Sequence, residues 1–80
     1  MDRTDIERII NDFLVEEIEI EPQLIRDDAL LTDDLGIDSL DFVDIVVIVE
    51  RNFGFVIKPE EMAGVDTYSK FCDYIATKVG

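Results

Sequence analysis

The chain has 80 residues, enough for one small domain but too few for two, and the 48% that are hydrophobic supply a single modest core. Seven basic residues against twenty acidic ones leave a net charge of −13, which excludes nucleic acid or an anionic membrane as the main partner. The chain lacks histidine, the most common general base and metal ligand, and its one cysteine cannot form an internal disulfide or a multi-thiolate zinc site.

The first predicted helix begins at Thr4, because Thr4 and Glu7 have the spacing of a capping box. Apolar residues then recur at i, i+3, i+4 and i+7, which forms one helical face: Ile6, Ile9, Ile10 and Phe13. Residues 18–20 also fit a short alternating strand. Pro22 and the lack of a partner strand favour a helix end followed by a loop.

Residues 19–37 are predicted to form a long loop that packs over the core. Four leucines are too apolar for a free loop: Leu24, Leu30, Leu31 and Leu35. Four aspartates keep its outer side solvated: Asp27, Asp28, Asp33 and Asp34. A loop of this length inside a compact domain is often functional.

The second predicted helix covers residues 38–51. Asp38 is a good N-cap, and Asp41 complements the positive end of the helix dipole. The many β-branched residues favour a strand by propensity, but the length and the spacing of the large apolar residues favour a helix. Its expected buried face consists of Phe42, Ile45, Val46, Val49 and Phe53.

The remaining residues predict one short helix and one longer one. Gly54 ends the second helix, and Pro59 begins a short third helix that extends to Met62. Asp66 or Thr67 caps the last helix, whose buried stripe is Tyr68, Phe71, Cys72, Ile75 and Val79. We therefore expect an all-α, four-helix bundle of three longer helices and one short one, with near-antiparallel packing, and residues 1–80 as one domain.

Ser39 is the strongest candidate for chemistry. It lies at the start of a predicted helix, after a glycine-containing loop and between acidic neighbours. No histidine is present to activate it and Lys58 is the only nearby base, so a hydrolytic nucleophile is not expected. An exposed hydroxyl here suits covalent attachment by another enzyme; alternatively, it serves as a helix cap.

The segment 34–41, with the sequence DLGIDSLD, and the apolar helix that follows it resemble the acyl carrier protein family. The motif is Asp-Ser-Leu, preceded by Leu-Gly-x and followed by an acid. The chain length, the acidic loop, the short helix near Pro59 and the pair Tyr74-Ile75 also agree, so the resemblance covers nearly the whole chain. It implies that Ser39 carries 4′-phosphopantetheine, transferred from coenzyme A by a phosphopantetheinyl transferase.

The resemblance further implies a discrete carrier rather than an enzyme. Acyl intermediates would be held as thioesters and delivered to loading, condensing and reducing enzymes of fatty-acid or polyketide-type synthesis. Two alternatives stay open: an aminoacyl or peptidyl carrier loaded by an adenylating enzyme, and an acidic adaptor that is never modified. We expect a monomer in the cytoplasm without a membrane span, since no apolar run approaches about 20 residues and no signal-peptide pattern is present.

Acidic residues near Ser39, and apolar residues outside the buried stripe, are candidates for a docking surface that recognises basic partners. The acids could instead be a solvated face, and the apolar residues could pack under the loop. The candidates are Asp38, Leu40, Asp41, Val43, Asp44, Val47, Glu60 and Glu61. The spacing of the acids does not match a calcium-binding loop, so no metal site is expected.

Several large side chains stand where many family members carry smaller ones, and we expect them to reshape an acyl pocket between the helices. This departure favours a specialised lipid or polyketide-like pathway. The predicted pocket lining is Phe42, Val49, Ile57, Met62, Val65, Phe71 and Tyr74. Cys72 lies on the buried stripe of the last helix and is expected to be a small inert hydrophobe rather than an acyl-bearing thiol.

Overall fold

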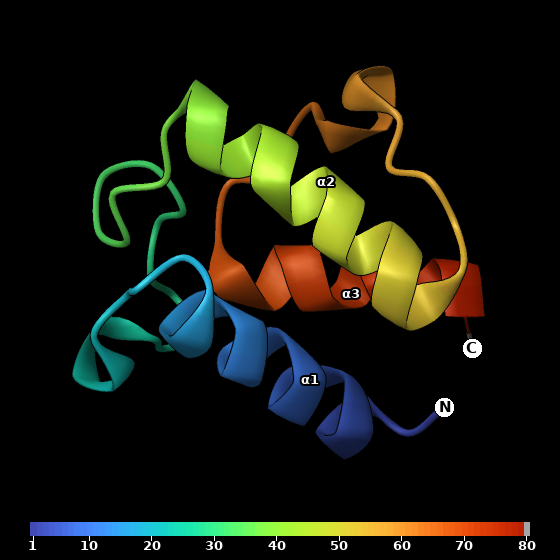
Figure 1. Ribbon diagram of the computed structural model, residues 1–80, viewed down its shortest axis with the longest axis horizontal. Helices are drawn as coiled ribbons and strands as arrows, with labels where there is room; N and C mark the ends of the chain where they lie inside the picture. The colour runs from blue at the N-terminus through green and yellow to red at the C-terminus, as the bar shows by residue number, and fades with distance from the viewer. Residues whose placement is uncertain (80) are drawn as a thin grey trace.

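The computed structural model describes residues 1–79 as a bundle of three α-helices and two 3₁₀ helices. In chain order these are α1 (Arg3–Glu16), η1 (Pro22–Leu24), α2 (Ser39–Phe53), η2 (Pro59–Met62) and α3 (Tyr68–Val79). The predicted all-α fold is confirmed, with η2 as the short third helix; η1 was not predicted. Figure 1 shows that α1 runs opposite to α2 and α3, which point the same way, so the antiparallel expectation holds for α1 alone.

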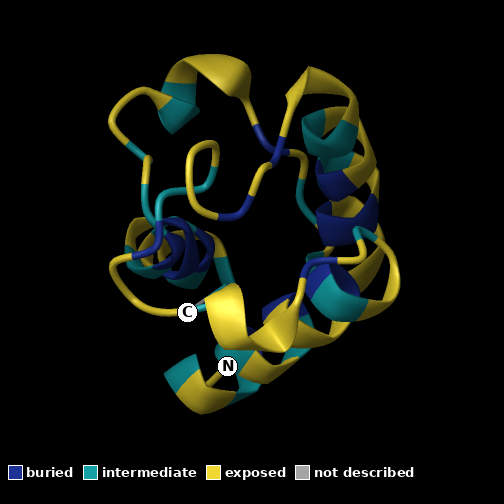
Figure 2. Ribbon diagram, turned by 90° about the vertical axis from the view of Figure 1, so that its left-hand side faces the viewer, coloured by how far each residue is buried: buried dark blue, intermediate teal, exposed yellow. Residues whose placement is uncertain are grey.

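The core lies where the inner faces of the three α-helices meet, and Figure 2 shows the buried segments on those faces. Its most deeply buried side chains are Ile6, Ile10, Leu14, Val49, Cys72 and Ile75. Ile48 is also buried, although the predicted stripe of α2 omitted it. Phe42, Val46 and Phe53 of that stripe are only half-buried. The buried centre of α2 is therefore rotated toward Ile48.

The predicted capping box of Thr4 and Glu7 is wrong. Helix α1 begins one residue earlier, at Arg3, and Asp2 occupies the N-cap position without a side-chain hydrogen bond. Arg3 donates from Nε to the Glu7 carboxylate at 2.9 Å and also pairs with Asp73 of α3. With Asp2 as the N-cap, Glu7 lies beyond the N3 position of a capping box, and its carboxylate instead binds a guanidinium that joins α1 to α3.

The long loop is attached to the start of α3 by backbone pairing. Leu30 and Thr67 form an antiparallel bridge, and the Leu31 N–H donates to the Asp66 carbonyl at 2.9 Å. Residues 18–20 continue from α1 as a turn and loop, as predicted, rather than as a strand. The loop therefore has its own fixed path over the core.

The loop leucines differ in burial. Leu35 is buried, and Leu30 and Leu31 are half-buried, as expected of anchors. Leu24 is 38% exposed, so its predicted anchoring role is wrong. Leu24 ends η1 on the outside, and Ile20 and Ala29 on either side of that turn are the buried residues instead. All four predicted loop aspartates are exposed.

The predicted helix boundaries after residue 50 follow the expected signals. Gly54 adopts a left-handed conformation with φ +79°, and its N–H donates to the Glu50 carbonyl at 3.0 Å. Pro59 is the first residue of η2. Of the two candidate caps for α3, Thr67 is the one used, because its Oγ1 accepts from the Lys70 N–H at 3.2 Å.

Burial of Cys72 predicts a loss of stability in alkali. Burial raises the pKa of this thiol from 9.0 to about 11. Between these values the unfolded chain has lost a proton that the folded chain retains, so the free energy of unfolding falls as pH rises, by at most about 1.4 kcal/mol per pH unit. Urea denaturation from pH 8 to pH 10 measures the slope below the range in which the buried Tyr68, whose pKa is raised above 10.0, also contributes. Cys72→Ala should flatten it, and equal slopes in both proteins would contradict the assignment to Cys72.

Candidate functional site

The start of α2 is held by a reciprocal pair of hydrogen bonds. The Asp41 N–H donates to Asp38 Oδ1 at 2.8 Å, and the Asp38 N–H donates to Asp41 Oδ2 at 3.4 Å. Asp38 is in an extended backbone conformation, so Ser39 is the first helical residue. Ser39 is exposed. The two aspartates predicted as cap and first-turn acid thus form a capping box that presents Ser39 to solvent.

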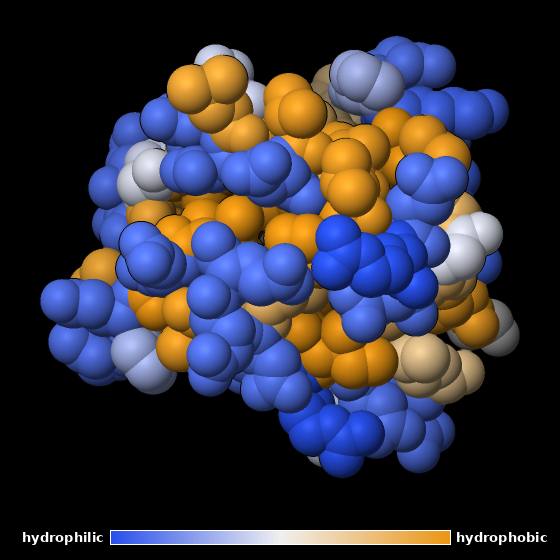
Figure 3. All heavy atoms as spheres, viewed as in Figure 1, coloured by the Kyte–Doolittle hydropathy of each residue, from blue (hydrophilic) through white to orange (hydrophobic). Residues whose placement is uncertain are grey.

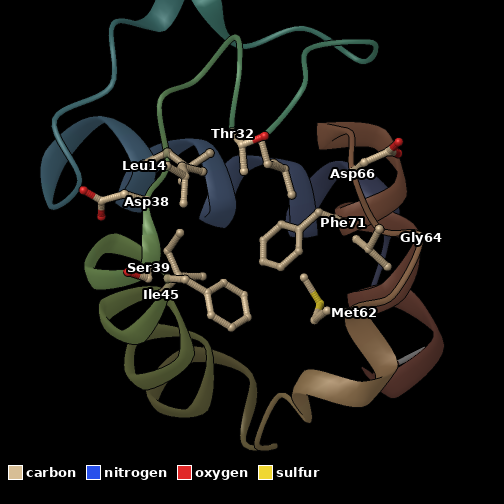
Figure 4. A pocket seen from close by; sticks show the side chains of 13 residues that line it. Leu14, Thr32, Asp38, Ser39, Ile45, Met62, Gly64, Asp66 and Phe71 are labelled. Carbon is tan, nitrogen blue, oxygen red and sulfur yellow. The ribbon is translucent and has the colours of Figure 1, made fainter.

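A cavity of about 520 Å³ lies beside Ser39, between α2, the long loop, η2 and α3. Figure 4 shows Ser39 and Ile45 on one side of this cavity, with Met62 opposite and the ring of Phe71 extending into it above Met62. Most of its lining is apolar. The lining residues are Leu14, Leu31, Thr32, Ile37, Asp38, Ser39, Phe42, Ile45, Met62, Gly64, Val65, Asp66 and Phe71.

Four of the seven residues expected in an acyl pocket line this cavity: Phe42, Met62, Val65 and Phe71. The other three do not. Val49 and Ile57 are buried in the core, at 0% and 2% exposure. Tyr74 points its hydroxyl to Glu61 instead, at 2.8 Å.

Sequence reasoning missed the contribution of the loop to this cavity. Leu31 and Ile37 line it from the segment before α2, and Leu14 lines it from α1. Leu31 was predicted to pack over the core, but nothing in the sequence indicates that the core is open beneath it. The signal that was available is the apolar character of Leu31 and Ile37 on either side of an acidic turn.

The outer face of α2 carries an exposed apolar stripe. Leu40, Val43 and Val47 are 76%, 59% and 50% exposed, and their spacing places them on one side of the helix. Figure 3 shows hydrophobic side chains gathered along this helix among hydrophilic ones. Asp44, one turn after Leu40, is exposed beside the stripe. The stripe and its acidic neighbours therefore form one continuous face with Ser39.

The two glutamates of η2 differ in their surroundings. Glu60 is exposed, whereas Glu61 is half-buried. Glu61 accepts from the Tyr74 hydroxyl at 2.8 Å and from Lys78 Nζ at 3.0 Å. These two hydrogen bonds, the one from Tyr74 first, hold the pKa of the Glu61 carboxyl below its usual value. Glu61 is therefore engaged within the chain, unlike Glu60.

Within residues 1–79, no group of three or more acidic or cysteine side chains is arranged to hold a metal ion. No helix there is long and apolar enough to cross a bilayer.

Comparison with known proteins decides the family. The pattern described as "Phosphopantetheine attachment site" matches residues 8–75. Acyl carrier proteins of Buchnera aphidicola subsp. Acyrthosiphon pisum, from strains 5A, Tuc7 and APS, are each 37% identical to the chain over 73 residues, which is 91% of both chains. The chain belongs to the acyl carrier protein family. It is a carrier that bears phosphopantetheine as its prosthetic group, and not an enzyme.

The capping box of this carrier protein can be tested by two substitutions at one position. Asp38→Ala should lower the free energy of unfolding by about 1 kcal/mol, because it removes the acceptor for the Asp41 N–H. Asp38→Asn should retain most of the stability, since asparagine caps helices equally well without a charge. Urea denaturation gives both values. Equal destabilisation by both variants would show that the charge, and not the cap, is what stabilises α2.

Proposed function

We propose that Ser39 is the residue that bears phosphopantetheine, and that the chain acts as a single carrier domain for acyl intermediates of fatty-acid or polyketide-type synthesis. The observation that carries this proposal is an exposed hydroxyl on the first residue of α2, beside a largely apolar cavity. The resemblance of DLGIDSLD to the family motif supports the same residue.

The surroundings of Ser39 fit the attachment chemistry. The first N–H groups of a helix have no intrahelical acceptor, and the helix dipole places partial positive charge there, so an attached phosphodiester is favourably located. Ser69, the other serine, is half-buried, and its Oγ lies 3.4 Å from the Arg3 guanidinium. Ser69 is therefore a poor substrate for a modifying enzyme, and Ser39 is an accessible one.

The bound group supplies a terminal thiol on a flexible arm, which carries the cargo between partner enzymes. The protein itself shelters and presents that cargo. The cavity beside Ser39 offers apolar contacts from Phe42, Met62 and Phe71. Each methylene that enters such a site contributes about 0.8 kcal/mol, so medium-length chains are retained much more strongly than acetyl.

We also propose that the stripe of Leu40, Val43 and Val47 is the docking face, with the acids that flank it. The net charge of −13 favours partners with basic surfaces, among them the phosphopantetheinyl transferase and the enzymes that load, condense and reduce the cargo in the cytoplasm. Apolar contact supplies the affinity and the acids speed the encounter.

The attachment site is tested by intact-mass measurement. Incubation with coenzyme A and a broad-specificity phosphopantetheinyl transferase should add one phosphopantetheine to the wild-type chain. Ser69→Ala should gain the same mass, and Ser39→Ala should gain none. An unmodified wild-type chain, in an assay that modifies a known carrier, would refute the proposal.

The docking face is tested with the same transferase. Leu40→Ala removes the most exposed apolar side chain of the stripe and should lower kcat/KM by about fivefold or more, the effect of a moderate interface contact. Val56→Ala is the matched control, because Val56 is 55% exposed but lies beyond the end of α2. If the two variants lose the same activity, the stripe is not the docking face.

A further inference from the structure

Three side chains join η2 to α3 on one side of the cavity. The Glu61 carboxylate accepts from the Tyr74 hydroxyl at 2.8 Å and from Lys78 Nζ at 3.0 Å. The ammonium of Lys78 also lies 5.6 Å from the centroid of the Tyr74 ring. The ring of Phe55 meets Tyr74 edge-on, with centroids 6.1 Å apart. This cluster therefore links η2 to α3 beside the cavity.

Apart from the half-buried Met62, which packs against the core, helix η2 has little else to hold it in place. It is only four residues long and contains no fully buried side chain. Its own backbone bonding includes the Glu61 N–H to the Lys58 carbonyl at 2.9 Å, and the Val65 N–H returns to Met62 at 2.9 Å. A short 3₁₀ segment of this kind has low local stability. Contacts from α3 therefore decide where η2 lies.

The position of η2 determines the shape of the cavity. Met62, the last residue of η2, and Val65 just after it form the wall opposite Ser39, as Figure 4 shows for Met62. Movement of η2 away from α3 would carry this wall outward and open the cavity. Glu61 is adjacent to Met62, so a contact that fixes Glu61 also fixes the wall.

We propose that Glu61, Tyr74 and Lys78 form a latch that holds η2 over the cavity and thereby sets how readily an acyl chain enters and leaves. The inference rests on the proposed function, since it requires cargo at Ser39. It assigns Glu61 a positioning role within the chain, in place of a direct contact with partners.

Two substitutions weaken the latch with little change of shape. Tyr74→Phe removes only the hydroxyl that donates to Glu61 and keeps the ring against Phe55. Lys78→Gln replaces the ammonium that binds Glu61 with a shorter neutral amide and removes one positive charge. Arg8→Gln is the control for the lost positive charge. Among the ion pairs of residues 1–79, Arg8 takes part only in the one with Asp5, on the exposed side of α1.

The test measures release of cargo from the phosphopantetheine-bearing chain loaded with octanoyl or acetyl groups. Hydroxylamine attacks the acyl carbon, the carbon–sulfur bond breaks, and the free thiol and an acyl hydroxamate result. Octanoyl should react more slowly than acetyl on the wild type, because the cavity shelters it. Tyr74→Phe and Lys78→Gln should each speed octanoyl release by about fivefold, the factor expected for one lost hydrogen bond, without changing acetyl release. Arg8→Gln should change neither rate.

A second measurement does not depend on cargo. In the unmodified chain, amide hydrogen exchange at Glu61 and Val65 should be faster in Tyr74→Phe, while exchange in α1 stays unchanged. A uniform increase over all helices would show a general loss of stability and overturn the latch.

The remaining outcomes separate the two proposals. A chain that gains no phosphopantetheine at Ser39 refutes the proposed function, and the latch with it. If hydroxylamine releases octanoyl and acetyl groups from the wild type at equal rates, the cavity does not shelter cargo, and the latch is refuted as well. If the wild type releases octanoyl slowly and the latch variants release it equally slowly, the latch is refuted and the proposed function is not.

Discussion

The reciprocal hydrogen bonds between Asp38 and Asp41 determine where α2 begins, and the rest of the site depends on that point. Because Asp38 stays extended, Ser39 becomes the first helical residue, and the rotation of every later side chain follows. Ile45 then faces the core and Leu40 faces solvent. If the helix began one residue later, Ser39 would lie outside it and would no longer be held in register with the faces of α2. One local capping interaction thus aligns the hydroxyl, the cavity and the exposed stripe.

The distribution of the few positive charges supports this arrangement. Among residues 1–79, five of the seven basic side chains form ion pairs: Arg3, Arg8, Arg51, Lys70 and Lys78. Four of these lie on α1 or α3, and no basic residue occurs between Arg26 and Arg51. Residues 27–50, which comprise the second half of the loop and most of α2, therefore carry only negative charge, which directs positively charged groups in solution toward the start of that helix.

Much of this fold could be predicted because its boundaries are set by local chemistry. Gly54, Pro59 and Thr67 each act through backbone conformation or a hydrogen bond to a near neighbour. Their roles can therefore be predicted from the sequence. The Thr4 prediction was wrong because α1 begins at Arg3, whose guanidinium binds the Glu7 carboxylate and also reaches Asp73 of α3, a contact that the local sequence does not indicate.

The cavity was harder to predict because it depends on how three segments meet. The apolar faces of α2 and α3 indicated which residues turn inward, but apolar residues that fill a core and those that border a cavity have the same periodicity. Val49 and Tyr74 therefore looked equivalent to Phe42 and Met62 in the sequence. Only the positions of the loop and η2 distinguish the two pairs.

The antiparallel bridge between Leu30 and Thr67 has a consequence for how this molecule is divided. It brings together the two ends of the segment 30–67, which contains Ser39, α2, η2 and most of the cavity wall. Outside that segment, α1 and α3 pack on each other as a platform. The segment is thus connected to α1 and α3 through two points of the chain that lie side by side. Its cavity-wall residues can change through evolution, or be exchanged by design, provided that α2 keeps the buried side chains that pack on α1 and α3.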